Sequence, residues 1–291
     1  MDAETSGFLG LSPEYTNPAS ARYVVLPIPY EGTVSYKPGT AAGPMAIIEA
    51  SEQVELFDEE LLGEFYQAGV ATLPVVHPAP GPDGQMNRVY AAALPVLKEG
   101  KFLLTLGGEH SITAPVVAAC AEVHGEISVL QIDAHADLRE KYDGTKHSHA
   151  AVMRRVLEVT ESICQVGIRN LSREEFDDFP GQVKKFVTPQ IIESDPHWID
   201  RVLDSLGEMV YVTIDIDGFD PSVAPGTGTP EPGGLTWRQG LSLLRRVCAE
   251  RQVISADIVE VRPLGANHLT EFMAARLGYK LIAYTQAGAE G

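Results

Sequence analysis

The chain has few cysteines, and their arrangement excludes two classes of protein. The three cysteines, Cys120, Cys164 and Cys248, are an odd number in 291 residues and contain no Cys-x-x-Cys pair. A disulfide framework or a zinc site made of thiolates needs more cysteines at closer spacing. We therefore expect all three to pack in the core of a protein from a reducing compartment.

Positive charge and long apolar runs are also scarce. Lysine and arginine number 22 against 40 aspartates and glutamates, which gives a formal net charge of −18. A nucleic-acid surface needs a basic stripe, so we expect no nucleic-acid partner and a mild preference for cationic ligands.

The sequence contains no run of about 18 apolar residues, and the start MDAETSGFLGLSPEY lacks the basic and apolar parts of a signal peptide. We expect a cytoplasmic protein with no membrane partner.

Short β-rich segments alternate with segments of helical length. Eight segments are apolar on both faces, as buried strands are, and lie at 23–29, 69–76, 101–108, 126–135, 161–169, 183–188, 208–217 and 251–261. Helical patterns occupy gaps such as 43–57, 87–100 and 237–250. This alternation predicts a single three-layer α/β/α domain over residues 1–291, with a mostly parallel sheet of about eight strands. We expect residues 1–20 to lie on its surface, and the Pro/Gly-rich stretches 75–84 and 221–234 to be loops.

Polar side chains gather where three of the predicted strands end. The segments at these ends read GGEHS, DAHAD and DIDGFD, and they contain His110, Asp133, His135, Asp137, Asp215 and Asp217. In open parallel sheets ligands bind outside the carboxyl ends of the strands. Side chains two residues apart in an extended chain also point the same way. We therefore expect these residues to converge on one point.

Four aspartates brought together need positive charge, because buried carboxylates repel one another. No lysine or arginine occurs from Val212 to Pro232, and Arg139 and Lys141 lie beyond the DAHAD segment. Two divalent ions carry as many charges as four aspartates, so the charges favour a metal pair. Carboxylates and imidazoles without thiolate suit Mn²⁺, and also Zn²⁺, Co²⁺ or Fe²⁺. Such a pair makes hydroxide from water near neutral pH and polarises a substrate carbon.

Each motif alone has a simpler interpretation. A lone Asp-x-Asp or a histidine at a strand end is more often a turn cap or a hydrogen-bonded polar group. A calcium loop is disfavoured for DIDGFD, because it lacks the acidic residue at the third ligand position and the terminal glutamate. Three such strand ends in one chain favour the metal site.

At these residues the sequence resembles the ureohydrolase family of arginases and agmatinases. GGEHS, DAHAD and TIDIDGFDPSVAPGTGTPEPGG match family motifs in the family's order, and the resemblance extends from about Tyr23 to Tyr284. It implies the arginase-like three-layer domain and two manganese ions per subunit. One ion would be bound by His110, Asp133, Asp137 and Asp215. The second would be bound by Asp133, His135, Asp215 and Asp217, so that Asp133 and Asp215 bridge the ions.

The resemblance also implies catalytic roles. His149, in KHSHAAVMRR, matches the histidine that relays a proton to the leaving amine, and the nearby His147 fits that pattern less well. Glu260 matches the glutamate that holds the guanidinium of the substrate. Asp137 would accept a hydrogen bond from the hydroxide that bridges the ions. One departure is Glu109, where family members often carry Asp; it is not expected to bind metal.

The family divides by the distal end of the substrate. Arginases carry Asn two residues after their DAHxD motif and then a Ser/Thr-rich stretch, whereas this chain has Arg139 and EKYDGTKHSH. PYEGTVSYKPGTAAGP also resembles agmatinases. The resemblance thus implies a small cationic guanidino substrate, agmatine, cleaved to urea and putrescine. The alternatives are arginine and the guanidino acids 4-guanidinobutyrate and 3-guanidinopropionate, since Arg139 or Lys146 would supply the cation that a distal carboxylate needs.

The predicted mechanism uses all of the expected metal ligands, whereas the two alternative functions do not. Glu260 orients the guanidinium over the metal pair, the bridging hydroxide attacks its carbon, and His149 protonates the departing amine. A deacylase of acetylated polyamines would use one zinc on an Asp/His/Asp set and leave His110 without a role. A catalytically inactive polyamine sensor is the third reading. Family members commonly form trimers or hexamers, so the resemblance implies a homo-oligomer.

Overall fold

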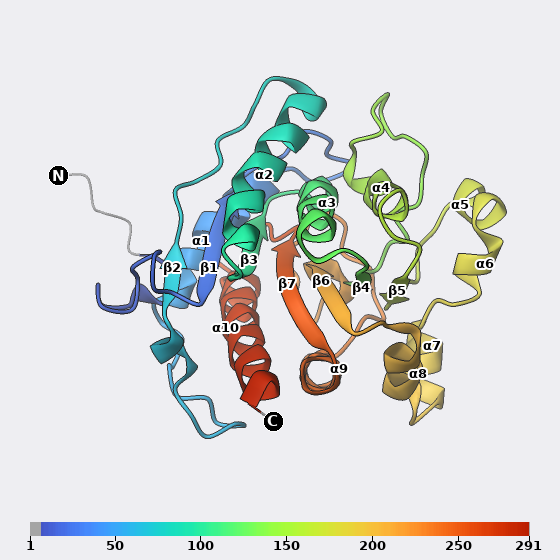
Figure 1. Ribbon diagram of the computed structural model, residues 1–291. Coiled ribbons are helices and arrows are strands. Elements are labelled where there is room, and N and C mark those ends of the chain that lie inside the picture. Colours follow the sequence, from blue (N-terminus) through green and yellow to red (C-terminus); the bar gives the residue numbers. More distant parts are fainter. Residues whose placement is uncertain (1–6, 291) are drawn as a thin grey trace.

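The centre of the fold is one parallel sheet of seven strands (Figure 1). The computed structural model describes residues 7–290. The strands lie side by side in the order β2-β1-β3-β7-β6-β4-β5, and every neighbouring pair is parallel. Their bounds are β1 Tyr23–Ile28, β2 Val70–Thr72, β3 Phe102–Gly107, β4 Ser128–Ile132, β5 Ile163–Val166, β6 Met209–Asp215 and β7 Gln252–Val259. The expected α/β fold is confirmed.

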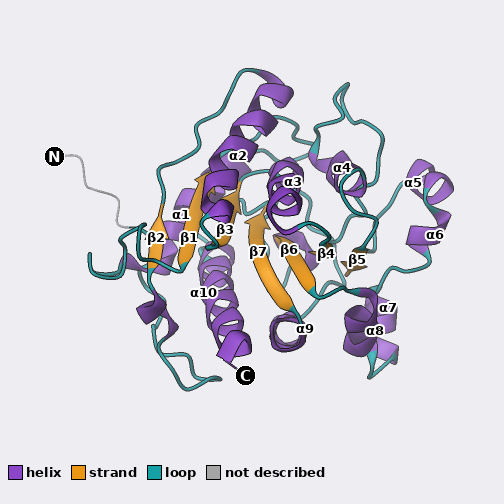
Figure 2. Ribbon diagram, viewed as in Figure 1, coloured by secondary structure: helices purple, strands orange, loops and turns teal. Residues whose placement is uncertain are grey.

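Helices cover both faces of the sheet (Figure 2). One face carries α2 Gly81–Lys98, α3 Thr113–His124 and α4 Val152–Leu157. The other face carries α1 Gly43–Ser51, α7 Pro189–Ser194, α8 Trp198–Ser205, α9 Trp237–Glu250 and α10 Leu269–Glu290. Val24 and Leu26 of β1 belong to the core of the first face, and Tyr23 and Val25 to that of the second. Successive side chains of a strand point to opposite faces, so strands apolar on both sides produce three layers.

Local signals set the helix ends. α9 has the predicted bounds, and Thr236 and Gln239 form a capping box at its start. α1 begins at Gly43 with a proline in its first turn, as expected, but ends at Ser51 instead of 57. α2 begins at Gly81, so residues 81–84, expected in a loop, are helical; Asp83 in the first turn complements the helix dipole. No helix in residues 7–290 is long and apolar enough to cross a membrane.

The eighth predicted strand, at 183–188, does not form. Only Val187 pairs with β5, through an isolated parallel bridge to Val166. The short helices α5 (Arg173–Asp178) and α6 (Pro180–Val183) precede it, and α6 takes up the start of the segment because a proline favours the first turn of a helix. The described sheet therefore has seven strands.

The expectation that residues 1–20 lie on the surface is wrong for two of the described residues. Residues 1–6 lie outside the described part of the chain, but Phe8 and Leu9 are buried in the core of the α1 and α10 face. The N–H of Phe8 donates to Thr72 Oγ1 at 2.8 Å, and that of Leu9 to Ser51 Oγ at 2.7 Å. Burial of a phenyl ring is worth about 1.5–3 kcal/mol, which is reason enough for the segment to pack inward.

The sheet order brings the predicted site residues to one edge. β3, β7, β6 and β4 are consecutive neighbours, and their carboxyl ends lie at the same edge of the sheet. The predicted site residues lie at or just after these strand ends: 109–110 after β3, 133–137 after β4, 215–217 at the end of β6, and Glu260 after β7. Residues far apart in the sequence therefore meet here.

Candidate functional site

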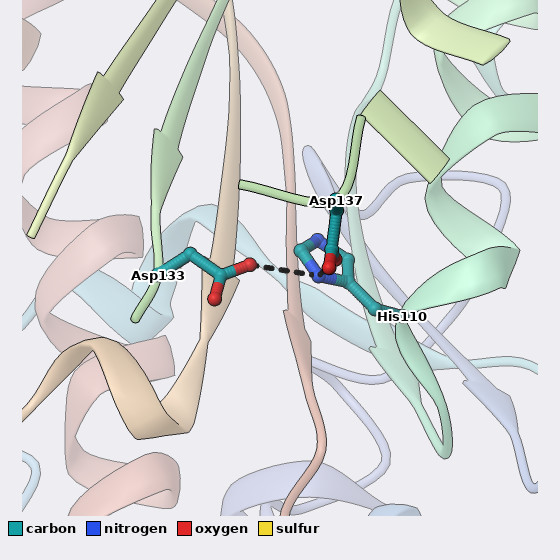
Figure 3. Close-up of side chains that lie close together, drawn as sticks. All are labelled: His110, Asp133 and Asp137. Atoms are coloured by element: carbon teal, nitrogen blue, oxygen red, sulfur yellow. Dashed lines mark ion pairs between the residues drawn. The ribbon is translucent and has the colours of Figure 1, made fainter. Parts of the chain in front are cut away.

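Four of the predicted ligands converge in a first cluster. The Nδ1 atom of His110 lies 3.1 Å from Asp133 Oδ2 and 3.2 Å from Asp137 Oδ2 (Figure 3). It also lies 3.5 Å from Asp215 Oδ2. His110 begins the 3-10 turn η4 (His110–Ile112), Asp133 follows β4, and Asp215 ends β6. All four side chains are buried.

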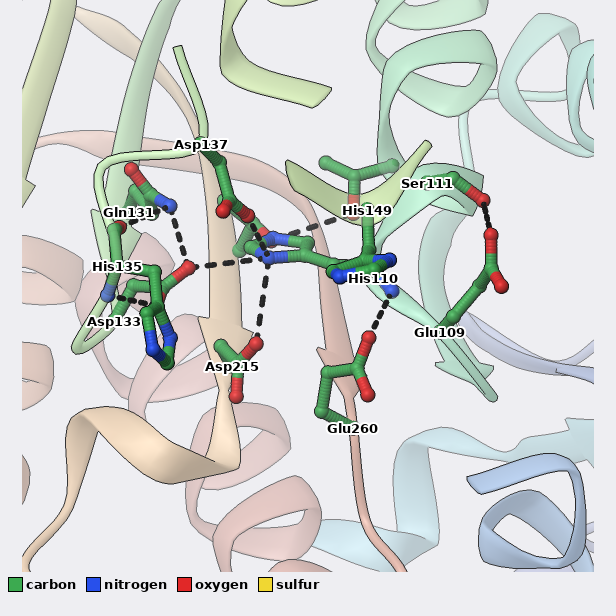
Figure 4. Close-up of polar contacts among 12 residues, drawn as sticks. Glu109, His110, Ser111, Gln131, Asp133, His135, Asp137, His149, Asp215 and Glu260 are labelled. Atoms are coloured by element: carbon green, nitrogen blue, oxygen red, sulfur yellow. Dashed lines mark hydrogen bonds and ion pairs between the residues drawn. The ribbon is translucent and has the colours of Figure 1, made fainter. Parts of the chain in front are cut away.

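A second cluster adjoins the first and shares Asp133 with it. His135 Nδ1 lies 3.1 Å from Asp217 Oδ2 and 3.7 Å from Asp133 Oδ1. Asp133 therefore faces both clusters, with Oδ2 toward His110 and Oδ1 toward His135 (Figure 4). The N–H of Asp217 donates to Asp215 Oδ1 at 2.9 Å, which ties together the aspartates of the two clusters. The six residues expected as ligands thus lie together.

Hydrogen bonds behind His110 determine which nitrogen faces the first cluster. His110 Nε2 lies 2.8 Å from Thr213 Oγ1, which donates to Asp257 Oδ1 at 2.6 Å. Since the single hydroxyl proton of Thr213 goes to the carboxylate, its oxygen accepts the Nε2 proton, and Nδ1 keeps its lone pair. Nδ1 is buried and has no hydrogen-bond partner among the described residues. A buried acceptor that faces three carboxylates fits a position beside a bound cation.

The two clusters carry more negative charge than the chain balances. In residues 7–290 no lysine or arginine pairs with these four aspartates, and the ion pairs that they form are with histidines. Burial, with a contribution from Asp133, raises the pKa of Asp137 to about 7. Burial, together with Asp217 and Asp133, raises the pKa of Asp215 well above its ordinary value. Divalent cations stabilise the ionised carboxylates, so each ligand group fits a hard metal ion.

Two site residues have a left-handed backbone. Asp137 has φ of 55° and Glu260 has φ of 61°, a conformation that costs a non-glycine residue about 1–3 kcal/mol and clusters at functional sites. The Glu260 N–H donates to Gly108 O at 2.8 Å, and its Oε1 accepts from the His110 N–H at 2.7 Å. A Cβ on Gly108 would lie 2.1 Å from Tyr30 O, so only glycine fits between these segments. The GGEHS turn thus holds Glu260 beside the first cluster.

A cavity of about 220 Å³ opens over the clusters. Its walls include Asp137, His149, Asp215 and Glu260. Burial, and next the neighbouring Glu109, raise the pKa of Glu260 well above its ordinary value. A cation in the cavity stabilises the ionised form, and a guanidinium offers paired N–H donors that match a carboxylate. Glu260 is therefore suited to hold a guanidinium beside the two ligand groups.

The structure separates the two candidate histidines. His149, in η5 (His149–Ala151), lies in the cavity wall, and its ring meets the Tyr142 ring edge-on at 5.7 Å. Burial is the largest cause of a lowered pKa of His149, which falls to about 4. His147 Nε2 instead pairs with Asp83 Oδ1 of α2 at 3.1 Å. Only His149 is placed to act on a ligand in the cavity.

Sequence reasoning missed the partners of His149. Thr33 and Ser35 contact its two ring nitrogens from a loop more than 100 residues earlier in the chain. The only sequence signal for this loop is the resemblance of PYEGTVSYKPGT to agmatinases.

Within residues 7–290, the cavity wall contains two cations that could contact the distal end of a substrate. Arg139, one of the two cations predicted for a distal carboxylate, lies in the wall, over the Tyr142 ring at 5.5 Å. Lys146 is not among the described wall residues, whereas Lys37, which sequence reasoning did not single out, is.

Comparison with known proteins decides the family. The arginase family model matches residues 21–283. This chain belongs to the arginase family. An N(1)-aminopropylagmatine ureohydrolase from Synechocystis sp. is 41% identical to it over 277 residues, which cover 92% of this chain and 90% of that protein. An agmatinase from Bacillus anthracis is 36% identical, with 83% of each chain covered.

A solved structure of the family has the same fold. The agmatine ureohydrolase of Thermoplasma volcanium superimposes with a TM-score of 0.89 at 31% identity, covering 99% of this chain and 97% of that one. The expected arginase-like fold and the expected enzyme class, a ureohydrolase, are confirmed by these relatives. Membership of this family disfavours the deacylase and the inactive sensor considered from the sequence.

Proposed function

We propose that this ureohydrolase cleaves the guanidinium group of N(1)-aminopropylagmatine to urea and spermidine, with two divalent metal ions as cofactor. The observation that carries the proposal is a single cavity with two His/Asp ligand groups that share Asp133 and, beside them, the carboxylate of Glu260. Donors for metal and an acceptor for guanidinium thus face the same space.

The metal pair that fits the donors best is two Mn²⁺. One ion would take His110, Asp133, Asp137 and Asp215, and the other Asp133, His135, Asp215 and Asp217. Oxygen-rich ligation with one imidazole for each ion suits Mn²⁺, and also Zn²⁺, Co²⁺ or Fe²⁺. When bound, a metal pair lowers the pKa of water and stabilises the charge that develops on the substrate.

The chain's own residues orient the substrate and move protons. Glu260 accepts N–H bonds from the guanidinium and so fixes its carbon over the ligand groups. Hydrolysis forms a bond from a water oxygen to this carbon and breaks its bond to the substituted nitrogen; both water protons end on the departing amine. With a pKa of about 4, His149 is neutral at pH 7. It therefore accepts one of these protons and hands it to the amine.

The substrate assignment rests on relatives and on charge. Three relatives that are 38–41% identical are named N(1)-aminopropylagmatine ureohydrolases. Relatives that are 34–36% identical are named agmatinases. Both substrates carry positive charge at the distal end, which an acidic chain attracts. Agmatine, cleaved to urea and putrescine, is therefore the second candidate.

Urea release by the manganese-loaded protein tests the proposal. N(1)-aminopropylagmatine, agmatine, arginine, 4-guanidinobutyrate and 3-guanidinopropionate are compared in parallel at pH 7.5. We expect kcat/KM for aminopropylagmatine to exceed that for agmatine by about 10-fold or more, since the longer chain adds contacts that the shorter one lacks. A higher value for agmatine would select the second candidate. A higher value for a guanidino acid, or no urea from any of the five, would contradict the proposal.

Assembly stays a prediction. Family resemblance implies a homo-oligomer, a trimer or a hexamer. Light scattering coupled to size-exclusion chromatography would measure the mass against the 31.4 kDa of one chain.

A further inference from the structure

The imidazole of His149 is held at both of its nitrogens. Nδ1 lies 3.0 Å from Thr33 Oγ1, and Nε2 lies 2.6 Å from Ser35 Oγ. The backbone N–H of His149 also donates to Thr33 Oγ1 at 3.2 Å. Ser148 Oγ lies farther from Nδ1, at 3.5 Å, so the direction of the nearer Thr33 hydroxyl decides which ring nitrogen carries the proton.

Glu109 settles the direction of that hydroxyl. Its Oε2 accepts from the N–H groups of Gly32 and Thr33, each at 2.6 Å. Its Oε1 accepts from the hydroxyls of Thr33 at 2.9 Å and Ser111 at 2.5 Å. Four donors use all the acceptor positions of a carboxylate, and none is left for a carboxyl proton. Thr33 therefore donates its single hydroxyl proton to Glu109, and its oxygen accepts the Nδ1 proton of His149.

The same arrangement occurs behind His110. There a histidine N–H donates to Thr213, which donates to the buried Asp257, and the opposite nitrogen faces the ligand cluster. Asp257 accepts further hydroxyl bonds from Tyr211 at 2.5 Å and Thr113 at 2.8 Å. A histidine, a threonine and a buried carboxylate are thus linked twice in this site.

We propose that Thr33, held by Glu109, is a positioning residue that fixes His149 in the tautomer with the proton on Nδ1 and the lone pair on Nε2. Nε2 is then the atom that takes a proton and passes it to the leaving amine, and the Ser35 hydroxyl donates to it until substrate is bound. The effect of the tautomer on the rate rests on the proposed hydrolysis, whereas the tautomer itself follows from the hydrogen bonds alone. Glu109, which stands where family members often carry Asp, is thus the residue that holds Thr33.

Kinetics of Thr33 variants form the first test. Thr33→Val keeps the shape and removes the hydroxyl, so kcat should fall about 10- to 100-fold while KM changes by less than about 3-fold, because the proton transfer is impaired and not binding. Thr33→Ser restores the hydroxyl and should recover most of kcat. Thr160→Val is the matched control: Thr160 donates to Ile127 O at 2.7 Å, is not among the described residues of the cavity wall and has no hydrogen bond to a described histidine. Its kcat should stay near the wild-type value.

A double-mutant cycle separates positioning from a general structural role. If Thr33 acts through His149, then adding Thr33→Val to His149→Asn causes no further loss of kcat. Equal fold-losses from Thr33→Val in both backgrounds would overturn the proposal, as would an unchanged kcat in the single variant.

Side-chain nitrogen NMR gives a readout that does not depend on activity. The protein is loaded with Zn²⁺, which is diamagnetic, and the signals of His149 are assigned by comparison with His149→Asn, since the chain has 8 histidines. We expect a protonated Nδ1 and a bare Nε2 in the wild type, and loss of this preference in Thr33→Val. The opposite tautomer in the wild type would overturn the inference even if urea is released. The expected tautomer without urea release would instead refute only the proposed function.

Discussion

Two groups of carboxylates in this protein differ in how their charge is balanced. The first surrounds Lys280 of α10, whose Nζ lies 2.8 Å from Asp58, 3.3 Å from Glu59 and 3.4 Å from Glu60. The side chains of Lys280 and Asp58 are each only 2% exposed. Arg276 and Arg245 pair with the two glutamates at 2.9 and 2.6 Å. Three cations of the chain thus meet three carboxylates.

The second group, at the carboxyl edge of the sheet, has no such balance. Its four aspartates, Asp133, Asp137, Asp215 and Asp217, have ion pairs with histidines only, among the described residues. The same residue types therefore serve two purposes. The balanced group ties the turn at 58–60 to α10 and stabilises the fold, whereas the unbalanced group is completed by cations from outside the chain.

The largest expected effect comes from removing the carboxylate that both ligand groups share. Asp133→Asn should lower kcat/KM by more than about 100-fold. Loss of a residue that only supports a metal ligand already costs up to about 100-fold, and Asp133 would be a ligand itself. The metal content, measured by mass spectrometry of the digested protein, should fall below two ions per chain. Asp220→Asn is the control, because the Asp220 side chain accepts hydrogen bonds from Ser222 and from the Gly233 N–H and belongs to neither ligand group. An Asp133→Asn protein that keeps two ions and full activity would break the comparison.

The balanced group should respond in stability instead of rate. Lys280→Met leaves a buried carboxylate without its partner, so the free energy of unfolding should fall by about 3–5 kcal/mol. Guanidinium denaturation measures this change. The half-exposed Arg276 is the matched control, since Arg276→Met should cost less than about 1 kcal/mol. The kcat of folded Lys280→Met should equal that of the wild type; a rate loss larger than the loss of folded protein would mean that the two groups are coupled.

The smallest expected effect is a pH dependence at His149. Its pKa is lowered from 6.5 to about 4, first by burial, so the folded protein holds the neutral imidazole. The stability from this shift is fully present above pH 6.5 and is lost as the pH falls through 4, up to about 3 kcal/mol. Between pH 6.5 and 4.5 the free energy of unfolding should therefore fall more steeply for the wild type than for His149→Asn. Parallel curves would show that the imidazole is not buried as described.

The ligand groups could be predicted from sequence because their signals are local. Alternation places Asp133, His135 and Asp137 within five residues, and a parallel sheet brings its strand ends to one edge. The confirmed fold supplies that edge. The role of Glu260 could be predicted only from the family resemblance, because a single glutamate after a strand does not by itself indicate a binding site.

What the sequence could not predict depends on distant contacts. His149 meets Thr33 across 116 residues, and Lys280 meets Glu60 across 220. The predicted strand at 183–188 failed because a proline-led helical turn took up its first residue. Phe8 packs into a core and beside hydrogen-bond acceptors, Ser51 and Thr72, that lie far from it in the sequence. Periodicity reports which face is apolar, not which segment will cover it.

The most direct test of the central claim is a titration of metal-free protein with Mn²⁺ while urea release from N(1)-aminopropylagmatine is followed. If the unbalanced aspartates hold a metal pair, the activity is absent without metal and saturates at two ions per chain. Urea release by the metal-free protein, or saturation at one ion, would contradict it.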